Sequence, residues 1–391
     1  MLGTNPPQGG EASWYNSALL ISAGATGAFL SDNIISFFAF HELALIPTFV
    51  MIGLYGRGDR RTTAWRATLY LGLASMVLLA ALLMIGTQAG FTFSGLKDFM
   101  ASGRELAHAE LIGALLIAGF GTLISLFPFH SWAAPAYASA PAPVAMMHAG
   151  VLKKFGLYGL FMFQPLMETG FLPWTNILLV LLVCNVIWVG YVTVNQKRLD
   201  LLLGNSSVMH MGYIFLAFAA LVVSGSAEAN PWALKGAALL MLAHGLTIAL
   251  LFLLCGQIEK QTGTLEINSL GGLSTRLPRM AFVFGLAGMA SIGLPGLANF
   301  PGEFMVFFSG FAGFSNGFGP VQIATILCLW GLVIGAVYML RAYRNIFQGD
   351  LSKASAYATG LQPSERAANC FLVIALAVFG FFPTLVLQFF S

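Results

Sequence analysis

Long apolar runs separated by short polar stretches fill almost the whole chain. About eleven of these runs approach the roughly 20 residues that a helix needs to cross a bilayer. They cover residues 17–30, 33–55, 64–87, 107–127, 143–163, 175–194, 201–223, 232–256, 278–313, 320–346 and 366–389. Because the runs are continuous rather than alternating, they predict helices and not the strands of a membrane barrel. The pattern therefore predicts an all-α polytopic membrane protein.

Two of the runs are interrupted by proline and glycine. The first interruption is "FPFHSWAAPAYASAPAPV", residues 127–144, and the second is "GLPGLANFPGEFMVFF", residues 293–308. Proline removes a backbone donor, and irregular backbone at membrane depth is tolerated only where it is buried in protein or lines a polar cavity.

The two interruptions fall in the fourth and ninth runs, which are five runs apart. This spacing predicts a repeated unit of five helices that covers 17–163 and then 175–346, each copy with one broken helix. Because five is odd, the second copy is inverted in the membrane. One more helix at 364–391 follows the repeats.

Composition agrees with a membrane location. Only 8% of the 391 residues are charged, whereas a soluble domain carries roughly 25%. The polar start "MLGTNPPQGGEASW" lacks the basic segment of a cleaved signal peptide, so we expect residues 1–16 to form a tail. We find no nucleotide loop or Cys/His cluster, and the four cysteines lack metal-ligand spacing. We therefore expect no cofactor and no metal in this chain.

Positive charge is distributed unevenly between the two sets of loops. Thirteen of the 18 Lys and Arg residues fall in one set, whereas the opposite loops hold Lys97 and Arg104. Positive residues favour the cytoplasmic side of short loops. The distribution predicts a cytoplasmic N-terminus and a C-terminus on the other side.

A few ionisable residues lie inside the apolar runs, where each is costly unless it faces a partner or a cavity. They are Glu42, His148, Lys153, Lys154, His210, Lys235, His244 and Glu303. Carboxylate, lysine and histidine groups at membrane depth are what a proton relay requires. Lys235 is near a helix end, where it can extend to the interface, and His210 can simply bond two helices. Lys153 and Lys154 point about 100° apart, so they cannot face one cavity equally.

Several segments resemble, in order, the antiporter-like proton-conducting subunits of respiratory complex I, and most closely the M-type subunit. These are "FAFHELALIPTFVMIGLYG", "FPFHSW", "HAGVLKKFGLYGL", "SSVMHMGY", "GAALLMLAHGLTIALLFLLCGQ" and "GLPGLANFPGEF". The resemblance implies two inverted five-helix repeats and a proton relay of the essential Glu42, the central Lys154 and His244, and the exit residue Glu303. Secondary relay candidates are His148, Lys153, His130, Lys197 and His210.

The chain departs from the family pattern at four points. The family lysine seven residues before His130 is replaced by Leu123, which removes the usual cation partner of the glutamate. His41, His130 and Lys153 are the alternative partners. Pro135 and Tyr137 replace the family's Asp and His. His148 stands where the L-type sister subunit has a central histidine. The M-type subunit usually has three more N-terminal spans, so we expect this chain to begin directly before the repeats.

These residues leave three functions open. The first is a proton-translocating membrane subunit of an NADH:quinone oxidoreductase, with NADH, FMN, Fe–S clusters and quinone on partner subunits. The second is a subunit of a multi-subunit cation/proton antiporter or a membrane-bound hydrogenase-type complex. The third is a structural membrane-arm subunit that no longer pumps. Asn299 and Glu303 in the second broken helix leave Na⁺ open beside H⁺.

In the first function we expect the chain in the inner (plasma) membrane of a prokaryote, bound to other membrane-arm subunits and lipid, with no nucleic acid. The half with Lys154, His244 and Glu303 stays competent, and the half with Glu42 is modified or inactive.

Overall fold

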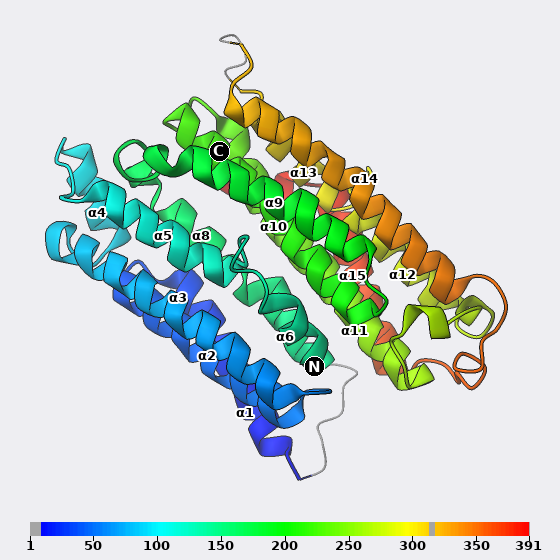
Figure 1. Cartoon of the computed structure of the whole chain (residues 1–391). Coiled ribbons are helices and arrows are strands. Elements are labelled where there is room, and N and C mark those ends of the chain that lie inside the picture. The colour runs from blue at the N-terminus through cyan, green and yellow to red at the C-terminus, as the bar shows by residue number, and fades with distance from the viewer. Residues whose placement is uncertain (1–8, 313–316, 391) are drawn as a thin grey trace.

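Helices of very different length build the protein, and they run roughly parallel in two groups (Figure 1). The computed structural model describes residues 9–312 and 317–390. The first group contains α1 (Glu11–Leu30), α2 (Ile34–Tyr55), α3 (Arg60–Ala89), α4 (Phe93–Ala101), α5 (Ala109–Ile124), α6 (Ala133–Ser139), α7 (Ala142–Met147), the π-helical turn His148–Leu152 and α8 (Lys154–Met162).

The second group contains α9 (Thr175–Val194), α10 (Leu199–Ser224), α11 (Pro231–Thr262), α12 (Pro278–Ser291), α13 (Asn299–Ser309), α14 (Pro320–Phe347), α15 (Pro363–Phe381) and α16 (Thr384–Leu387). Within the described ranges there is no strand beyond two isolated bridges. The predicted all-α class is confirmed.

Among the residues that the structure describes, seven helical segments are long and apolar enough to cross a membrane. They are α2, α3, α10, α11, α14, α15 and the segment 164–194 that ends in α9. The other predicted spans correspond to α1, to the shorter helix α5, to the series from α7 to α8, and to the pair α12 and α13 that the second break separates. The layout with eleven spans therefore stays a prediction. α1 begins at Glu11, inside the segment 1–16 that we expected to be a tail.

Both predicted helix breaks exist, but they are shorter than the proline-rich stretches suggested. The helix is interrupted at 125–132, between α5 and α6, and at 292–298, between α12 and α13. Much of 127–144 and 293–308 is helical because the prolines lie at helix starts, where a missing backbone N–H costs little. Pro141, for example, is the N-cap of α7, and Pro301 lies in the first turn of α13.

The side chain of Asn185 on α9 makes hydrogen bonds to backbone groups of the first break. Its Oδ1 accepts a hydrogen bond from the backbone N–H of Phe127 at 2.5 Å, and its Nδ2 donates to the carbonyl of Ser125 at 3.1 Å. The same Nδ2 also reaches the carbonyl of Val208 on α10 at 3.1 Å. Because unpaired backbone groups are costly at membrane depth, this amide makes the irregular backbone tolerable and anchors it to the second group.

α10 forms the centre of the bundle, and nearly all of its apolar stretch is buried. It packs against α9, α11, α13 and α14, and also against α6 of the first group. Small residues permit this approach: a Cβ on Gly204 would lie 2.8 Å from the Cα of Ala134. The short helix after the first break therefore connects the two groups at their core.

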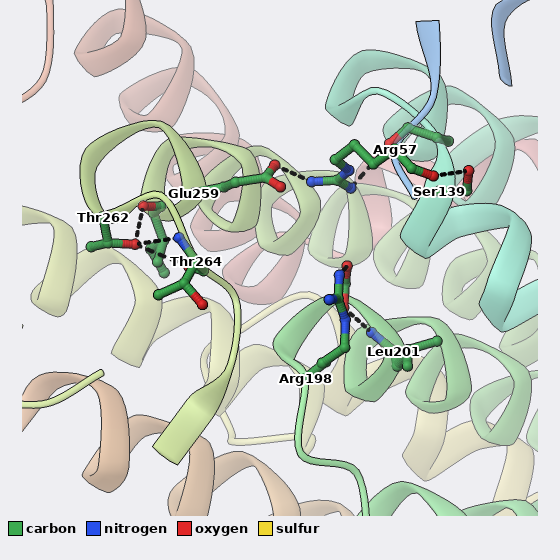
Figure 2. A network of polar contacts seen from close by, with 10 residues as sticks. Arg57, Ser139, Arg198, Leu201, Glu259, Thr262 and Thr264 are labelled. Atoms are coloured by element: carbon green, nitrogen blue, oxygen red, sulfur yellow. Dashed lines mark hydrogen bonds and ion pairs between the residues drawn. The ribbon is translucent and has the colours of Figure 1, made fainter. Parts of the chain in front are cut away.

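A polar network joins the groups at one end of the bundle (Figure 2). The guanidinium of Arg57, which follows α2, bonds to Glu259 of α11 and donates to the carbonyl of Ala140 at 3.0 Å. Nearby, Arg198 donates to the fully buried carboxylate of Asp200 at 2.7 Å. The hydrogen bond that Arg198 donates to Asp200 raises the pKa of the Arg198 guanidinium. The two ion pairs place arginine at the ends of α2 and α10.

Candidate functional site

Two buried histidines face each other between α10 and α11. The rings of His210 and His244 are stacked, with 5.3 Å between their centroids and 18° between their planes. The Nε2 atom of His244 lies 3.2 Å from the hydroxyl of Ser207. Both histidines are 2% exposed, so only protein groups and enclosed water can exchange protons with them.

His210 makes hydrogen bonds through both ring nitrogens. Nδ1 lies 2.8 Å from the carbonyl oxygen of Ser206, and Nε2 lies 2.9 Å from that of Ser291. Both partners accept only, and an imidazole donates from both nitrogens only when it is protonated. Ser291 is also the last residue of α12, where the helix dipole favours a positive charge. A neutral His210 ring can therefore donate to only one of these two carbonyls at a time.

Lys154 is the first residue of α8 and points toward the histidine pair. Its Nζ donates to the carbonyl of Ala149, five residues back, at 2.7 Å. That carbonyl belongs to the π-helical turn His148–Leu152. In a π-helix the backbone hydrogen bonds join residues five positions apart instead of the four of an α-helix. The ammonium of Lys154 lies within electrostatic reach of His244 and His210. The predicted central lysine and central histidine are thus brought together.

Lys153 points into a different part of the bundle. Its Nζ lies 5.5 Å from the centroid of the Tyr137 ring and has no hydrogen-bond partner among the described residues. Tyr137 belongs to α6, whereas the histidines that Lys154 approaches belong to α10 and α11. The divergence expected for adjacent helical residues is confirmed.

Glu42 on α2 has His41 as its basic neighbour. The carboxylate accepts from the hydroxyl of Ser75 at 2.5 Å and lies 3.3 Å from Nδ1 of His41. Of the three alternative partners, His41 is the one that the structure brings into contact, and Lys153 does not bond to the carboxylate. Leu123 is buried in α5. The Glu42 side chain is 32% exposed and lines a cavity of about 130 Å³ between α2 and α3.

Glu303 lies in α13, just beyond the second break. It is 3% exposed, and its Oε1 has no partner among the described residues. A Cβ on Gly293 would lie 2.0 Å from Oε2, so only glycine leaves room for this carboxylate. The positive φ of 72° at Gly293 requires glycine as well. The break therefore shapes a pocket for the Glu303 side chain.

Hydroxyl groups lie between the histidine pair and Glu303, and sequence reasoning missed them. Ser206 on α10 bonds to the hydroxyl of Tyr338 on α14 at 2.7 Å. Tyr338 and Tyr213 both lie within electrostatic reach of Glu303. A signal existed for the first of these groups, because "SSVMH" places two serines in an apolar run one turn before His210. Nothing in the sequence indicates that Tyr338 meets them.

The remaining candidates lie outside this buried group. Lys197 is exposed in the turn before α10, and Lys235 is partly exposed near the start of α11, as expected for a residue that extends to the interface. His130 is half-buried in the first break and stacks on Phe127 with 5.4 Å between ring centroids. His148 is buried, and its ring packs against Tyr137 at 5.4 Å.

Comparison with known proteins assigns the chain to a family. The transmembrane model of the NADH:quinone oxidoreductase/Mrp antiporter family matches residues 31–332. The chain is 35% identical over 380 residues to NAD(P)H-quinone oxidoreductase chain 4 1 of Synechococcus elongatus, covering 95% of this chain and 68% of the relative. It is 33% identical over 369 residues to chain 4 2 of Microcystis aeruginosa, covering 92% and 64%. The chain spans about two thirds of the length of these relatives.

Solved structures agree with this assignment. A chain of respiratory complex I from Thermus thermophilus is similar with a TM-score of 0.86 and 27% identity, over 96% of this chain and 77% of that one. A chain of the Mrp complex from Dietzia sp. shares the fold with a TM-score of 0.83 at 19% identity, over 97% and 78%. With its buried lysine, histidine pair and carboxylate, the chain belongs to the NADH:quinone oxidoreductase/Mrp antiporter transmembrane family.

Proposed function

We propose that the chain is a proton-translocating membrane subunit of an NADH:quinone oxidoreductase assembly. The observation that carries this proposal is the buried series Lys154, His244, His210 and Glu303, which crosses from α8 through α10 and α11 to α13. The curated relatives are named as chain 4 of NAD(P)H-quinone oxidoreductases, which supports the choice of assembly. NADH, FMN, Fe–S clusters and quinone reside on partner subunits.

Each group in the series has a distinct role. Lys154 holds a proton as an ammonium that the Ala149 carbonyl orients, and releases it toward His244. The stacked pair of His244 and His210 carries one proton at a time, because two adjacent imidazolium rings would repel each other strongly in a buried site. Glu303 receives the proton through the hydroxyls of α10 and α14 and releases it beyond the break.

The predicted repeats remain part of this proposal. Equivalent neighbours support them: α1 packs on α2 as α9 packs on α10, and α2 packs on α3 as α10 packs on α11. Each group also has one broken helix. We therefore propose eleven spans in two inverted repeats, with the arginine-bearing end of Figure 2 on the cytoplasmic side. This places the N-terminus in the cytoplasm and the C-terminus outside the plasma membrane of a prokaryote.

A second candidate is a subunit of a cation/proton antiporter, which the fold of the Mrp complex favours. A sodium site needs several oxygen ligands. At the second break the side-chain amide of Asn299 lies 2.9 Å from the hydroxyl of Thr247, which also donates to the carbonyl of Ala243 at 2.9 Å. Asn299 and Glu303 are the residues that would supply oxygen ligands at this break.

The test uses the assembled membrane complex purified through a tag on this chain. We expect subunits that oxidise NADH and bind quinone to co-purify, and we expect the Lys154→Met variant to lose redox-driven proton uptake in vesicles. The Lys235→Met variant is the matched control, because that lysine is partly exposed near a helix end. Proton uptake at the parental rate with Lys154→Met, or co-purification of antiporter subunits alone, contradicts the proposal.

A further inference from the structure

An apolar groove separates α12 from α14, which pack side by side in the second group of helices (Figure 1). Its volume is about 310 Å³. Phe284 and Met339 are buried at its floor, whereas Phe282 and Leu340 at its rim are 67% and 55% exposed. The groove therefore opens toward the lipid that surrounds a membrane protein.

Two glycines of α12 keep this groove open. A Cβ on Gly285 would lie 3.3 Å from Cε2 of Tyr343, and a Cβ on Gly288 would lie 3.3 Å from Cε of Met339. Because larger side chains at either position would project into the groove, glycine leaves room there for another molecule. The apolar lining suits hydrocarbon, since an internal water needs two to four polar partners.

Arginine marks one end of the groove on both of its helices. Arg279 lies three residues before Phe282, and Arg344 lies four residues after Leu340, so each arginine shares the helix face that lines the groove. Both arginines are exposed, and neither side chain makes a hydrogen bond or an ion pair with the described residues. The groove therefore ends at two positive charges that no carboxylate of the described chain neutralises.

The length of the groove matches one leaflet of a bilayer. The ten residues Phe282–Ser291 of α12 rise about 15 Å, which is half of the roughly 30 Å hydrocarbon core. The arginine end lies at the end of the bundle that Figure 2 shows, because Glu266, in the segment that leads to α12, lies 3.9 Å from Arg198. At its other end the groove reaches Ile292 in the second break.

We propose that this groove binds one anionic phospholipid of the cytoplasmic leaflet, with its phosphate at Arg279 and Arg344 and one acyl chain along α12 as far as the second break. Basic pockets between membrane helices on the cytoplasmic side bind such headgroups. A helix of a partner subunit fits less well. It crosses the whole bilayer, whereas the groove covers one leaflet, and it brings no anion to the arginines.

The acyl chain supports the backbone of the second break from the lipid side. Ile292 follows Ser291, whose carbonyl oxygen lies 2.9 Å from Nε2 of His210. It also precedes Gly293, the glycine that leaves room for Glu303. A chain packed on Ile292 therefore limits the movement of the break. This effect on proton uptake rests on the proposed function, but the binding of the lipid does not.

Photo-crosslinking of the assembled complex tests the site. The probes are phosphatidylcholine vesicles that contain either phosphatidylglycerol or phosphatidylcholine with the same diazirine-bearing acyl chain. We expect phosphatidylglycerol to label peptides of α12 and α14 severalfold more than phosphatidylcholine does, and an equal concentration of inorganic phosphate not to displace it. Equal labelling by the two lipids, displacement by phosphate, or a groove that a partner subunit shields from both lipids overturns the inference.

Charge variants test the headgroup end. We expect the double variant Arg279→Gln/Arg344→Gln to lower labelling by phosphatidylglycerol to the level of phosphatidylcholine. The matched control is Lys353→Gln/Arg366→Gln, which removes two exposed charges at the same end of the bundle but outside the groove. Parental labelling in Arg279→Gln/Arg344→Gln, or an equal loss in the control, overturns the inference.

Gly285→Leu tests the acyl-chain end and its effect on the break. We expect the leucine side chain to exclude the acyl chain and to lower proton uptake severalfold in vesicles that contain phosphatidylglycerol. Ile177→Trp, at a position of α9 that is 53% exposed, should change neither. If Gly285→Leu fails to assemble, Arg279→Gln/Arg344→Gln provides the same test of uptake.

The two readouts separate the lipid site from the proposed function. Parental uptake in a variant that no longer binds the lipid overturns the support of the break by the acyl chain. Parental uptake in Lys154→Met instead contradicts the proposed function and leaves the crosslinking result standing.

Discussion

The ring of His210 stacks on that of His244 at 5.3 Å, and its Nε2 reaches the last carbonyl of α12 at 2.9 Å. This arrangement couples the proton of a histidine pair to the backbone of a broken helix. When His210 is neutral, it can donate to only one of its two carbonyl partners, Ser206 or Ser291. The loss of a proton therefore gives up either the bond to Ser206 within α10 or the bond to Ser291 that joins α10 to α12.

The first prediction concerns His210. His210→Ala leaves the carbonyls of Ser206 and Ser291 without this partner, so we expect a loss of about 1–3 kcal/mol in stability together with lower proton uptake. His210→Gln can restore one of the two hydrogen bonds and should recover part of the stability but not the uptake. Thermal unfolding and proton uptake of the purified complex measure the two effects. Full uptake in His210→Gln would show that this histidine only supports the fold.

The second prediction separates two buried carboxylates. Glu303 has an unpartnered oxygen beside the break, whereas Glu365 is paired with Lys260 at 2.7 Å and caps α15. We expect Glu303→Gln to abolish proton uptake with little change in stability. Glu365→Gln should lower stability and keep the uptake per assembled complex. If Glu303→Gln keeps the uptake and Glu365→Gln abolishes it, Glu303 is not the residue that releases the proton.

The third prediction tests the contact between His41 and Glu42. Removing its basic neighbour with His41→Phe should shift the carboxyl stretching band of Glu42 in difference infrared spectra, because Nδ1 of His41 lies 3.3 Å from the carboxylate. Ser75→Ala is the comparison, because it removes the 2.5 Å hydrogen bond but leaves the histidine. An unchanged band in His41→Phe would mean that the imidazole does not influence the carboxylate.

The fourth prediction concerns the ion pair between Arg57 and Glu259 in Figure 2. Its side chains are 24% and 34% exposed, and pairs of this kind contribute about 0.2–1 kcal/mol. A double-mutant cycle with Arg57→Gln and Glu259→Gln should give a coupling energy in that range that decreases with salt. Arg57→Gln should be the more damaging single change, because Arg57 also bonds to Ala140. Strict additivity would exclude coupling between the two groups of helices at this end.

The fifth prediction compares two glycines. A Cβ on Gly245 of α11 would lie 2.7 Å from the carbonyl oxygen of Gly150, so Gly245→Ala must separate α11 from the π-helical turn. We expect a loss of about 1–3 kcal/mol. Gly72 in α3 has open space around it, and Gly72→Ala should stabilise its helix by about 0.5–1 kcal/mol. Thermal unfolding of both variants measures the two effects. Equal melting temperatures would show that α11 and the π-helical turn are not in close contact at Gly245.

Local patterns predicted much of this molecule. Apolar run length predicted the helices, and the prolines near 128 and 295 predicted that two of them are interrupted. The limits of the breaks were predicted less well, because a proline at a helix start looks the same in sequence as one that ends a helix. The burial of Lys154, His244 and Glu303 followed from their placement in apolar runs, since a charge there must face protein.

The partners of those charges were decided by tertiary structure alone. The sequence left three candidates for Glu42, of which the adjacent His41 on the same helix makes the contact, and packing added Ser75 of α3 to the same carboxylate. It could separate Lys153 and Lys154 by angle, but only the packing of the helices put Lys153 against the Tyr137 ring and both lysines within electrostatic reach of His244. The physical reason is range. Apolar periodicity and proline act within a few residues of the chain. The hydrogen bond between Ser206 and Tyr338 joins two residues 132 positions apart, so it depends on how α10 and α14 pack together.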